Sequence, residues 1–220
     1  MTTDARIPLS RERVLRAAVE LADEHGLRAL TMRRLAEELG AEAMSLYYHV
    51  AKKEDLLDGI VDVVAQEINE TVARLEAGPD WKQTARRRIL AARQVFLRHR
   101  WAPALFETRS STSLAVLKYY DTLVGLMREG GFSHDRIHHA LHALGSRALG
   151  FSQELFDPNA GASAEVPADL AAQLPNLVGM LSEIAHDDPD STLGWCDDQA
   201  EFEFGLDLVL DGLDRLRERD

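Results

Sequence analysis

The sequence predicts an all-α protein, and three observations lead to that prediction. Apolar residues recur at the three- and four-residue spacing of amphipathic helices along most of the 220 residues. Capping residues and glycines stand where these periodic segments begin and end. The one alternating segment, near the carboxyl end, has no second segment with which it would pair as a strand. We therefore expect helices almost throughout the chain.

Three amino-terminal helices are expected, at 10–26, 31–40 and 42–48. Ser10 and Thr31 are N-cap residues for the first two, and a glycine follows the last turn of each. Leu30 and Leu35 have the spacing of a hydrophobic staple around the Thr31 cap.

Later helices are expected at 53–78, 81–99, 103–106, 111–128, 133–156, 169–185 and 200–217. The segment 157–167 is rich in small residues and is expected to be an irregular loop. The start of the last helix is ambiguous, because Phe202, Phe204 and Leu206 alternate as in a strand. The apolar spacing further along, from Leu206 to Leu216, favours a helix.

Composition excludes several classes of protein. Hydrophobic residues make up 45% of the chain and charged residues 28%, which is typical of a globular protein and not of a disordered tail. The single cysteine, Cys196, excludes an intrachain disulfide and is typical of a reducing cytoplasm, where we expect the protein to be. No apolar run has the length of a membrane span, and the first residues lack the apolar core of a signal peptide.

A net charge of −12 repels a partner as acidic as DNA at long range, but the charge is unevenly distributed. The first 60 residues hold nine Lys/Arg and eleven Asp/Glu, so the remaining residues carry a net −10. Basic points stand at Arg6–Arg16, Arg33–Arg34 and Lys52–Lys53. Such local clusters can neutralise phosphates whatever the total charge is.

The segment 31–49, TMRRLAEELGAEAMSLYYH, has the form of a helix-turn-helix. The apolar residues that would join its two helices are Leu35, Ala36, Leu39 and Leu46. An ordinary helical hairpin, with Tyr47 and Tyr48 as partly buried packing, is the alternative. Lys52 and Lys53 favour DNA, because cations at a helix start oppose the helix dipole and a bound phosphate would explain them.

Residues Leu9–Ile60 resemble the DNA-binding domain of the TetR family of transcriptional repressors. The residues that carry this resemblance are Leu30-Thr31, Leu35-Ala36, Leu39-Gly40, Leu46-Tyr47-Tyr48-His49-Val50 and Lys53 with Leu56-Leu57. Weaker similarity to the tetracycline-repressor branch continues at His99-Arg100, Thr108-Arg109 and Gly131–Ser133, and returns clearly at Phe202–Leu216. Nearly the whole chain is thus covered.

The resemblance implies a set of DNA-binding residues: Thr31, Arg33, Ala43, Met44, Ser45, Tyr47, His49 and Lys53. Arg33 is the implied base contact and Lys53 the implied anchor for the DNA backbone. The tetracycline repressor has a glutamine and a proline where this chain has Ala43 and Met44. Losing the amide removes a reader of adenine, and Met44 can contact a thymine methyl group instead, so the operator is expected to differ.

The resemblance also implies a helical regulatory domain that binds a small-molecule effector. Its implied ligand-binding residues are Asn69, Arg88, Ala92, Phe96, Leu105, Phe106 and Ser146. The branch's metal-binding histidine is absent, so we expect no metal, no cofactor and no tetracycline–magnesium complex. The aromatic residues suggest a more apolar effector, with Arg88 meeting an acid or a carbonyl. Helices 133–156 and 200–217 would pair between two copies in a homodimer.

Three other motifs are better explained as structure than as chemistry. His134, His138 and His142 share one helix face, joined by His139, but have no carboxylate or cysteine partner for a metal. Glu183 and His186 make one Glu-x-x-His unit, whereas a di-iron bundle needs two. Cys196 has no cation or histidine beside it in the sequence that would activate its thiol.

We therefore predict a helix-turn-helix DNA-binding domain of three helices at 1–52 and a larger helical ligand-binding and dimerisation domain at 53–220. The predicted function is a transcriptional regulator, most simply a repressor, that a small molecule releases from double-stranded operator DNA. A helical ligand-binding or adaptor protein without DNA binding is the alternative. An enzyme is not expected, because no complete set of acids, nucleophiles or metal ligands is found.

Overall fold

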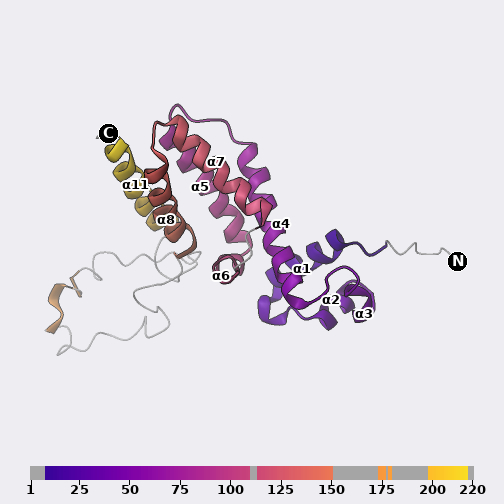
Figure 1. The fold of residues 1–220 in the computed structure, drawn as a ribbon. Helices are drawn as coiled ribbons and strands as arrows, with labels where there is room; N and C mark the ends of the chain where they lie inside the picture. Colours follow the sequence, from indigo (N-terminus) through magenta and orange to yellow (C-terminus); the bar gives the residue numbers. More distant parts are fainter. Residues whose placement is uncertain (1–7, 110–112, 151–172, 177, 180–197, 218–220) are drawn as a thin grey trace. The chain divides into compact units, whose positions relative to one another are not determined.

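A computed structural model describes residues 8–109, 113–150, 173–176, 178–179 and 198–217, with the backbone alone for 146–150 and 198. The elements are α1 (Arg11–His25), η1 (Leu27–Ala29), α2 (Met32–Glu38), α3 (Ala43–Leu46), α4 (Lys53–Ala73), α5 (Trp81–Arg98), α6 (Ala102–Thr108), α7 (Leu114–Glu129), α8 (His134–Gly150) and α11 (Asp198–Arg217) (Figure 1). The described residues contain no strand, which confirms the all-α prediction.

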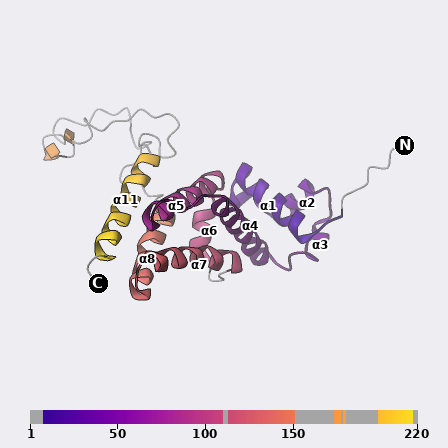
Figure 2. The same ribbon diagram turned by 90° about the horizontal axis from the view of Figure 1, so that it is seen from above.

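The chain divides into two compact units, Met1–His142 and Ala143–Asp220. In the first unit, α4 packs against α1 on one side and against α5, α6 and α7 on the other (Figure 2). In the second unit the carboxyl-terminal helix α11 begins at Asp198, so its alternating apolar residues belong to a helix and not to a strand.

We call α1, α2, α3 and the turns between them the head. Local capping determines where its first helices begin. The Ser10 side chain accepts a hydrogen bond from the backbone N–H of Arg13 at 3.2 Å, and Thr31 does the same for Arg34 at 3.2 Å. The staple residues Leu30 and Leu35 are fully buried in one cluster, as predicted. The shared core of the head and the first turns of α4 is formed by Val14, Leu15, Ala18, Leu21, Leu30, Leu35, Ala36, Leu46, Val50, Leu56 and Ile60.

The turn between α2 and α3 depends on Gly40, whose φ is 61°. The N–H of Gly40 bonds to the carbonyl of Glu37, and the N–H of Ala41 bonds to the carbonyl of Ala36. These two bonds form a Schellman motif, which ends a helix with one residue in the left-handed conformation. A Cβ at Gly40 would meet nothing within 4 Å, so glycine is needed there for its backbone and not for space.

Replacing Gly40 with alanine is therefore expected to cost about 1–2 kcal/mol of unfolding free energy, the penalty for an L-residue in this conformation. Gly131, with φ 91° and an equally open Cβ position, ends α7 with the same motif and supplies a matched control. Urea denaturation should give similar losses for Gly40→Ala and Gly131→Ala. Only Gly40→Ala should also weaken DNA binding, because only it tilts α3, and equal DNA affinities would contradict this account.

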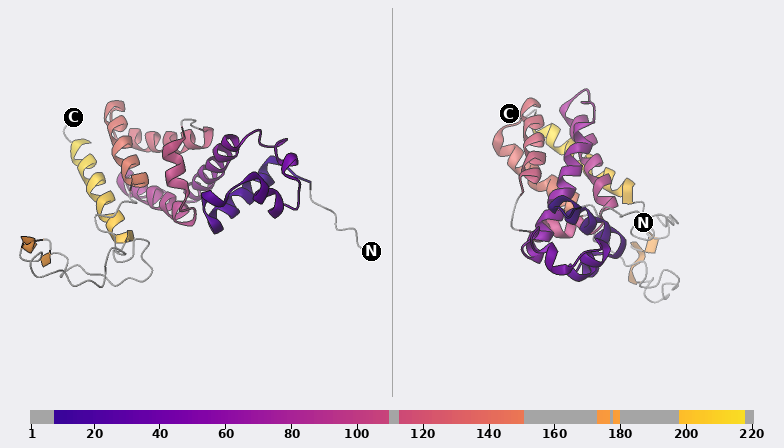
Figure 3. Two further views of the ribbon diagram at one scale, coloured as in Figure 1. Left: turned by 90° about the horizontal axis from the view of Figure 1, so that it is seen from below. Right: turned by 90° about the vertical axis from the view of Figure 1, so that its right-hand side faces the viewer.

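Helix α4 contributes to two different cores. Its first turns, through Leu56 and Ile60, belong to the head cluster. Further along, Val64, Ile68 and Val72 join a second cluster with Ala92, Val95 and Ala102. Figure 3 shows α1, α2 and α3 gathered near the beginning of α4. One continuous helix thus links the head to the helices that follow.

Two expectations about the helices need correction. The third helix is only Ala43–Leu46, because residues 47–49 leave the helix as a turn. The 3₁₀ helix at Leu27–Ala29 is too short to give a periodic signal and was not expected. The expected loop at 157–167, the Glu183–His186 unit, Cys196 and most of the expected helix 169–185 lie outside the described residues.

Candidate functional site

The surface around α3 combines a buried anchor with strongly exposed side chains. Leu46 is fully buried and fixes the helix to the head. Met44 is 72% exposed and Tyr48 is 90% exposed, whereas Tyr47 is 42% exposed and Ala43 is half-buried. An ordinary hairpin with both tyrosines packed does not fit these exposures. Large side chains held in solvent on a short, anchored helix and on the turn after it are typical of a contact surface.

Arg33 is held in place at the start of α2 by one neighbour. Its Nε lies 2.9 Å from Oε1 of Glu37, one turn later, and this pairing raises the pKa of the guanidinium. Both side chains are exposed, so the pair adds little to stability. In the described part of the chain the two terminal nitrogens of Arg33 have no partner, which leaves both available for a base edge.

The turn after α3 borders a shallow depression of about 440 Å³. It is lined by Arg11, Tyr47, Tyr48, His49, Ala51, Asp55 and Asp58. The Arg11 guanidinium donates to the carbonyl of His49 at 3.3 Å and so ties α1 to this turn. Tyr48 and Arg11 were not among the predicted site residues, because an aromatic residue near a core helix usually packs inward and Arg11 was only one of several basic residues.

Two predicted residues use their hydroxyl groups within the head. Thr31 accepts the capping hydrogen bond of α2, and the Ser45 hydroxyl donates to the carbonyl of Glu42 at 2.6 Å. Both therefore act first as positioning groups for their helices.

Lys53 is the first residue of α4, and Lys52 is its N-cap. The Lys52 side chain makes no capping hydrogen bond, and neither lysine has a side-chain partner among the residues that the structure describes. The first N–H groups of a helix lack partners within the helix and carry partial positive charge. Lys53 and these N–H groups together make this end of α4 suited to a phosphate.

The acidic residues next to this helix start are partly neutralised. Arg109, which follows α6, donates from Nε to Oδ1 of Asp58 at 2.6 Å and from Nη2 to the carbonyl of Glu54 at 3.1 Å. The hydrogen bond to Asp58 raises the pKa of Arg109. Arg109 therefore neutralises the charge of Asp58, which lines the depression, and connects α6 to the first turns of α4. The sequence offered no sign of this pair, which spans 51 positions.

Five of the seven predicted ligand-binding residues either surround an apolar cluster or bind backbone carbonyls. Ala92, Phe96 and Phe106 gather around one apolar cluster, where the rings of Phe96 and Phe106 meet edge to face at 5.3 Å. Asn69 and Arg88 instead bind backbone, donating to the carbonyls of Ala115 at 2.8 Å and of Thr122 at 3.4 Å on α7.

Leu105 is buried in the head cluster and not in the apolar cluster, while the side chain of Ser146 lies outside the description. Tyr119 of α7 packs against the apolar cluster, and burial raises the pKa of its phenol. Tyr119 was missed because its spacing gives it no distinction from Tyr120 in the sequence.

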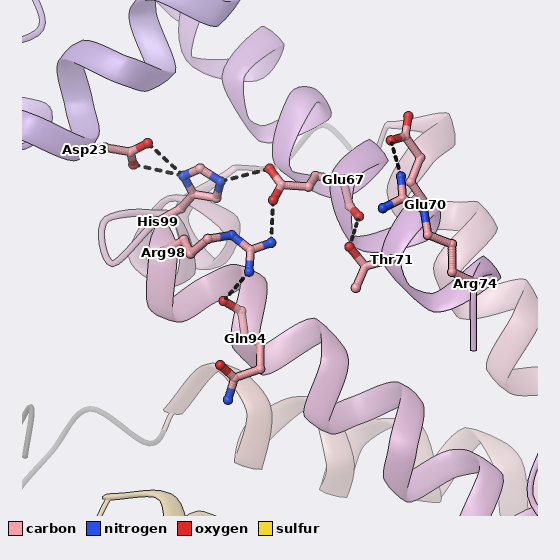
Figure 4. A network of polar contacts seen from close by, with 8 residues as sticks. All are labelled: Asp23, Glu67, Glu70, Thr71, Arg74, Gln94, Arg98 and His99. Atoms are coloured by element: carbon pink, nitrogen blue, oxygen red, sulfur yellow. Dashed lines mark hydrogen bonds and ion pairs between the residues drawn. The ribbon is translucent and has the colours of Figure 1, made fainter. Parts of the chain in front are cut away.

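A polar network joins α1, α4 and α5 (Figure 4). His99, just after α5, lies with Nδ1 2.9 Å from Oδ1 of Asp23 on α1 and with Nε2 3.0 Å from Oε2 of Glu67 on α4. Arg98 donates to the other oxygen of Glu67, and the indole N–H of Trp101 donates to Asp23 at 2.6 Å. Burial would raise the pKa of Glu67, but the hydrogen bonds from Arg98 and His99 outweigh it and hold that pKa below 4.5.

Glu67 is therefore expected to stabilise the fold only while it is ionised. Because its folded pKa is the lower one, its contribution is complete above the unfolded value near 4.5 and is lost as the pH falls through the folded value. Urea denaturation of Glu67→Gln should show a loss of about 1 kcal/mol at pH 7, since partial exposure weakens such bonds, and a smaller loss at pH 3.

Glu70→Gln is the control for this measurement, because Glu70 makes only an exposed pair with Arg74 at 3.7 Å. That variant should follow the parent protein at both pH values. A loss for Glu67→Gln that is the same at pH 7 and pH 3 would contradict the assignment.

The histidines of α8 are exposed, and the rings of His138 and His142 meet at 4.7 Å. The described residues contain no group of three or more His, Cys, Asp or Glu that could hold a metal ion. In the same part of the chain, no helix combines the length and apolar character needed to cross a membrane.

Two family descriptions match the chain. "Bacterial regulatory proteins, tetR family" matches residues 14–60, and "Tetracyclin repressor-like, C-terminal domain" matches residues 75–217. The first match contains α2, α3 and the beginning of α4. The second contains Phe96, Phe106 and the rest of the apolar cluster except its α4 residues.

Individual proteins agree with these matches. The tetracycline repressor protein class D of Escherichia coli is 32% identical over 211 residues, which are 94% of this chain and 89% of that protein. An HTH-type transcriptional regulator of Saccharopolyspora erythraea is 35% identical over 64% of this chain, a match that spans only 59% of that protein. The structure of the TetR family protein ActR of Streptomyces coelicolor in complex with actinorhodin has a TM-score of 0.70 and 27% identity, covering 94% of this chain and 97% of that one.

Proposed function

The chain belongs to the tetR family of bacterial regulatory proteins, and from that premise we propose which of its residues perform each part of the family's function. The protein is a DNA-binding transcriptional regulator that acts as a homodimer and responds to a small-molecule ligand. What remains to be assigned is which side chains read the operator and which receive the effector.

We assign operator reading to α2, α3 and the start of α4. Arg33 presents its two terminal nitrogens to a base, with guanine as the expected partner because arginine pairs bidentately with it. Met44, with Ala43 beside it, contacts thymine methyl groups. The DNA backbone is held by Thr31, Ser45, Tyr47, Tyr48, His49 and Lys53. The observation that carries this assignment is the lysine pair at the start of α4, which has no side-chain partner among the described residues and adjoins the exposed α3 surface.

We assign effector binding to the helices around the apolar cluster, α4 to α7. Phe96 and Phe106 would contact an apolar or aromatic effector, and Tyr119 is added to the predicted set. Asn69 and Arg88 lie on the same helices but already bind backbone carbonyls of α7, so an effector would have to displace these bonds to use them. The domain boundary at 52/53 remains a prediction and coincides with the start of α4.

We assign dimerisation to α8 and α11. Phe204 and Leu208 stand one turn apart on α11 and are both largely exposed, which suits a surface covered by a second copy. The family consists of transcriptional regulators, so a catalytic role is not proposed. Because its operator is bacterial DNA, we place the protein in the cytoplasm.

Retardation of the DNA that flanks its own gene tests the proposed function. The purified protein should retard one fragment specifically, and increasing salt should weaken the complex, because released counterions dominate such binding. Lys53→Ala should reduce affinity for every DNA sequence, by about tenfold for two copies per dimer at about 0.7 kcal/mol each. Lys118→Ala, which removes an exposed lysine from α7, is the matched control and should bind as the parent protein does. If no flanking fragment is retarded at low salt without ligand, the operator assignment fails.

A further inference from the structure

His99 lies at the centre of the polar network of Figure 4. The residue is 7% exposed, and its backbone N–H ends α5 by bonding to the carbonyl of Val95. Its ring connects two carboxylates on different helices, Asp23 of α1 and Glu67 of α4. These three residues stand far apart in the sequence, so the network exists only when the head is seated on α4 and α5.

The chemistry of imidazole explains why one residue can hold both helices. A neutral imidazole carries one N–H, so it can donate to only one of two carboxylates, while the protonated ring donates from both nitrogens. Each carboxylate also receives a second donor, from Trp101 for Asp23 and from Arg98 for Glu67. The charged groups around the ring are therefore the two carboxylates and the Arg98 guanidinium, which binds Glu67.

We propose that His99 is a positioning residue for the DNA-reading head: its Nδ1 contact with Asp23 fixes the carboxyl-terminal end of α1 against α5, and its Nε2 contact with Glu67 fixes α5 against α4. The consequence for operator binding rests on the proposed function. Movement of α5 is passed to α1 through Asp23, then to α2, which packs on α1, and from α2 to α3.

Two substitutions separate the two contacts. The amide of asparagine lies close to the position of Nδ1, so His99→Asn keeps a donor for Asp23 and loses the contact with Glu67. The longer glutamine places its amide near Nε2, so His99→Gln keeps a donor for Glu67 and loses the contact with Asp23. Both variants remove the same ring, so each is a matched control for the other.

Hydrogen–deuterium exchange of the full-length protein measures the positioning directly and needs no DNA. His99→Gln should increase exchange in residues 20–39, which contain Asp23 and α2. His99→Asn should instead increase exchange in residues 63–73, the second half of α4. Peptides from 118–129 of α7 should be unchanged in both. Equal exchange patterns in the two variants would overturn the proposal, because a ring that only fills space would not distinguish them.

Operator affinity, measured by fluorescence anisotropy, tests the consequence. His99→Gln should weaken binding by about tenfold, the value of one charge-assisted contact, while His99→Asn should stay within about threefold of the parent. Asp23→Asn combined with His99→Gln should lose no more affinity than His99→Gln alone, because asparagine can still accept from Trp101 and the contact with position 99 is already lost. If the parent protein binds no operator, the proposed function fails, whereas the exchange patterns still decide the role of His99.

Discussion

Replacing Arg33 with alanine is expected to weaken operator binding by about 2–6 kcal/mol, from about 1–3 kcal/mol for each bidentate base contact and two copies in the dimer. The structure supports this size of effect because Glu37 engages only Nε and leaves the two terminal nitrogens unpartnered within the described residues. The affected contact reads a base, so the variant should also lose its preference at one base pair of each half-site. Competition titrations with single-substitution operators measure both quantities.

Glu37→Gln and Lys53→Ala are the comparisons for this result. Glutamine can still accept a hydrogen bond from Nε, so Glu37→Gln should keep the base preference with little loss of affinity. Lys53→Ala should lower affinity for all operators alike, because a phosphate contact carries no sequence information. If Arg33→Ala shows the same uniform loss as Lys53→Ala, the base contact is assigned to the wrong residue.

Replacing Leu46 with alanine is expected to lower the free energy of unfolding by about 2–5 kcal/mol, the cost of a large-to-small change in a packed core. Leu46 is fully buried and is the one residue of the four-residue α3 that is buried in the head core. A helix of one turn has little stability of its own, so its orientation depends on this side chain. Urea denaturation measures the loss, and circular dichroism at 20 °C reports whether the rest of the helices remain folded.

The exposed Leu117 of α7 provides a matched leucine control. Leu117→Ala should change the unfolding free energy by less than about 0.5 kcal/mol, as is usual for surface positions. A small loss for Leu46→Ala, comparable with the control, would mean that α3 is not anchored by its apolar residue. If Leu46→Ala loses much of its unfolding free energy and still binds DNA as the parent protein does, the orientation of α3 does not depend on Leu46.

Features that depend on neighbouring residues were predictable from the sequence. The caps at Ser10 and Thr31, the staple of Leu30 with Leu35 and the end of α2 at Gly40 each involve residues within five positions. Their hydrogen bonds and burial match the sequence pattern, and so do the positions of α1, α2, α4 and α5. The burial of Leu46 and the exposure of Met44 follow from the same local periodicity.

Features that join distant residues were not predictable. Nothing in the sequence distinguishes Asp23, Glu67 and His99 from other polar residues, because spacing along the chain carries no information about a contact made after folding. Arg109 and Asp58 are a second example. The exposure of Tyr48 was also not predictable, because it depends on the path that the turn takes after α3 ends.

The close approach of α1 to α4 implies a constraint on how this sequence can drift over evolutionary time. A Cβ at Gly59, in the second turn of α4, would lie 2.4 Å from Cδ2 of Leu15, so the two positions share one volume. Glycine at position 59 destabilises the helix by about 1 kcal/mol relative to alanine. A smaller residue at position 15 would leave room for alanine at 59, and the helix would regain this stability. Among homologues we therefore expect the two positions to change together, with a small residue at one accompanying a larger residue at the other.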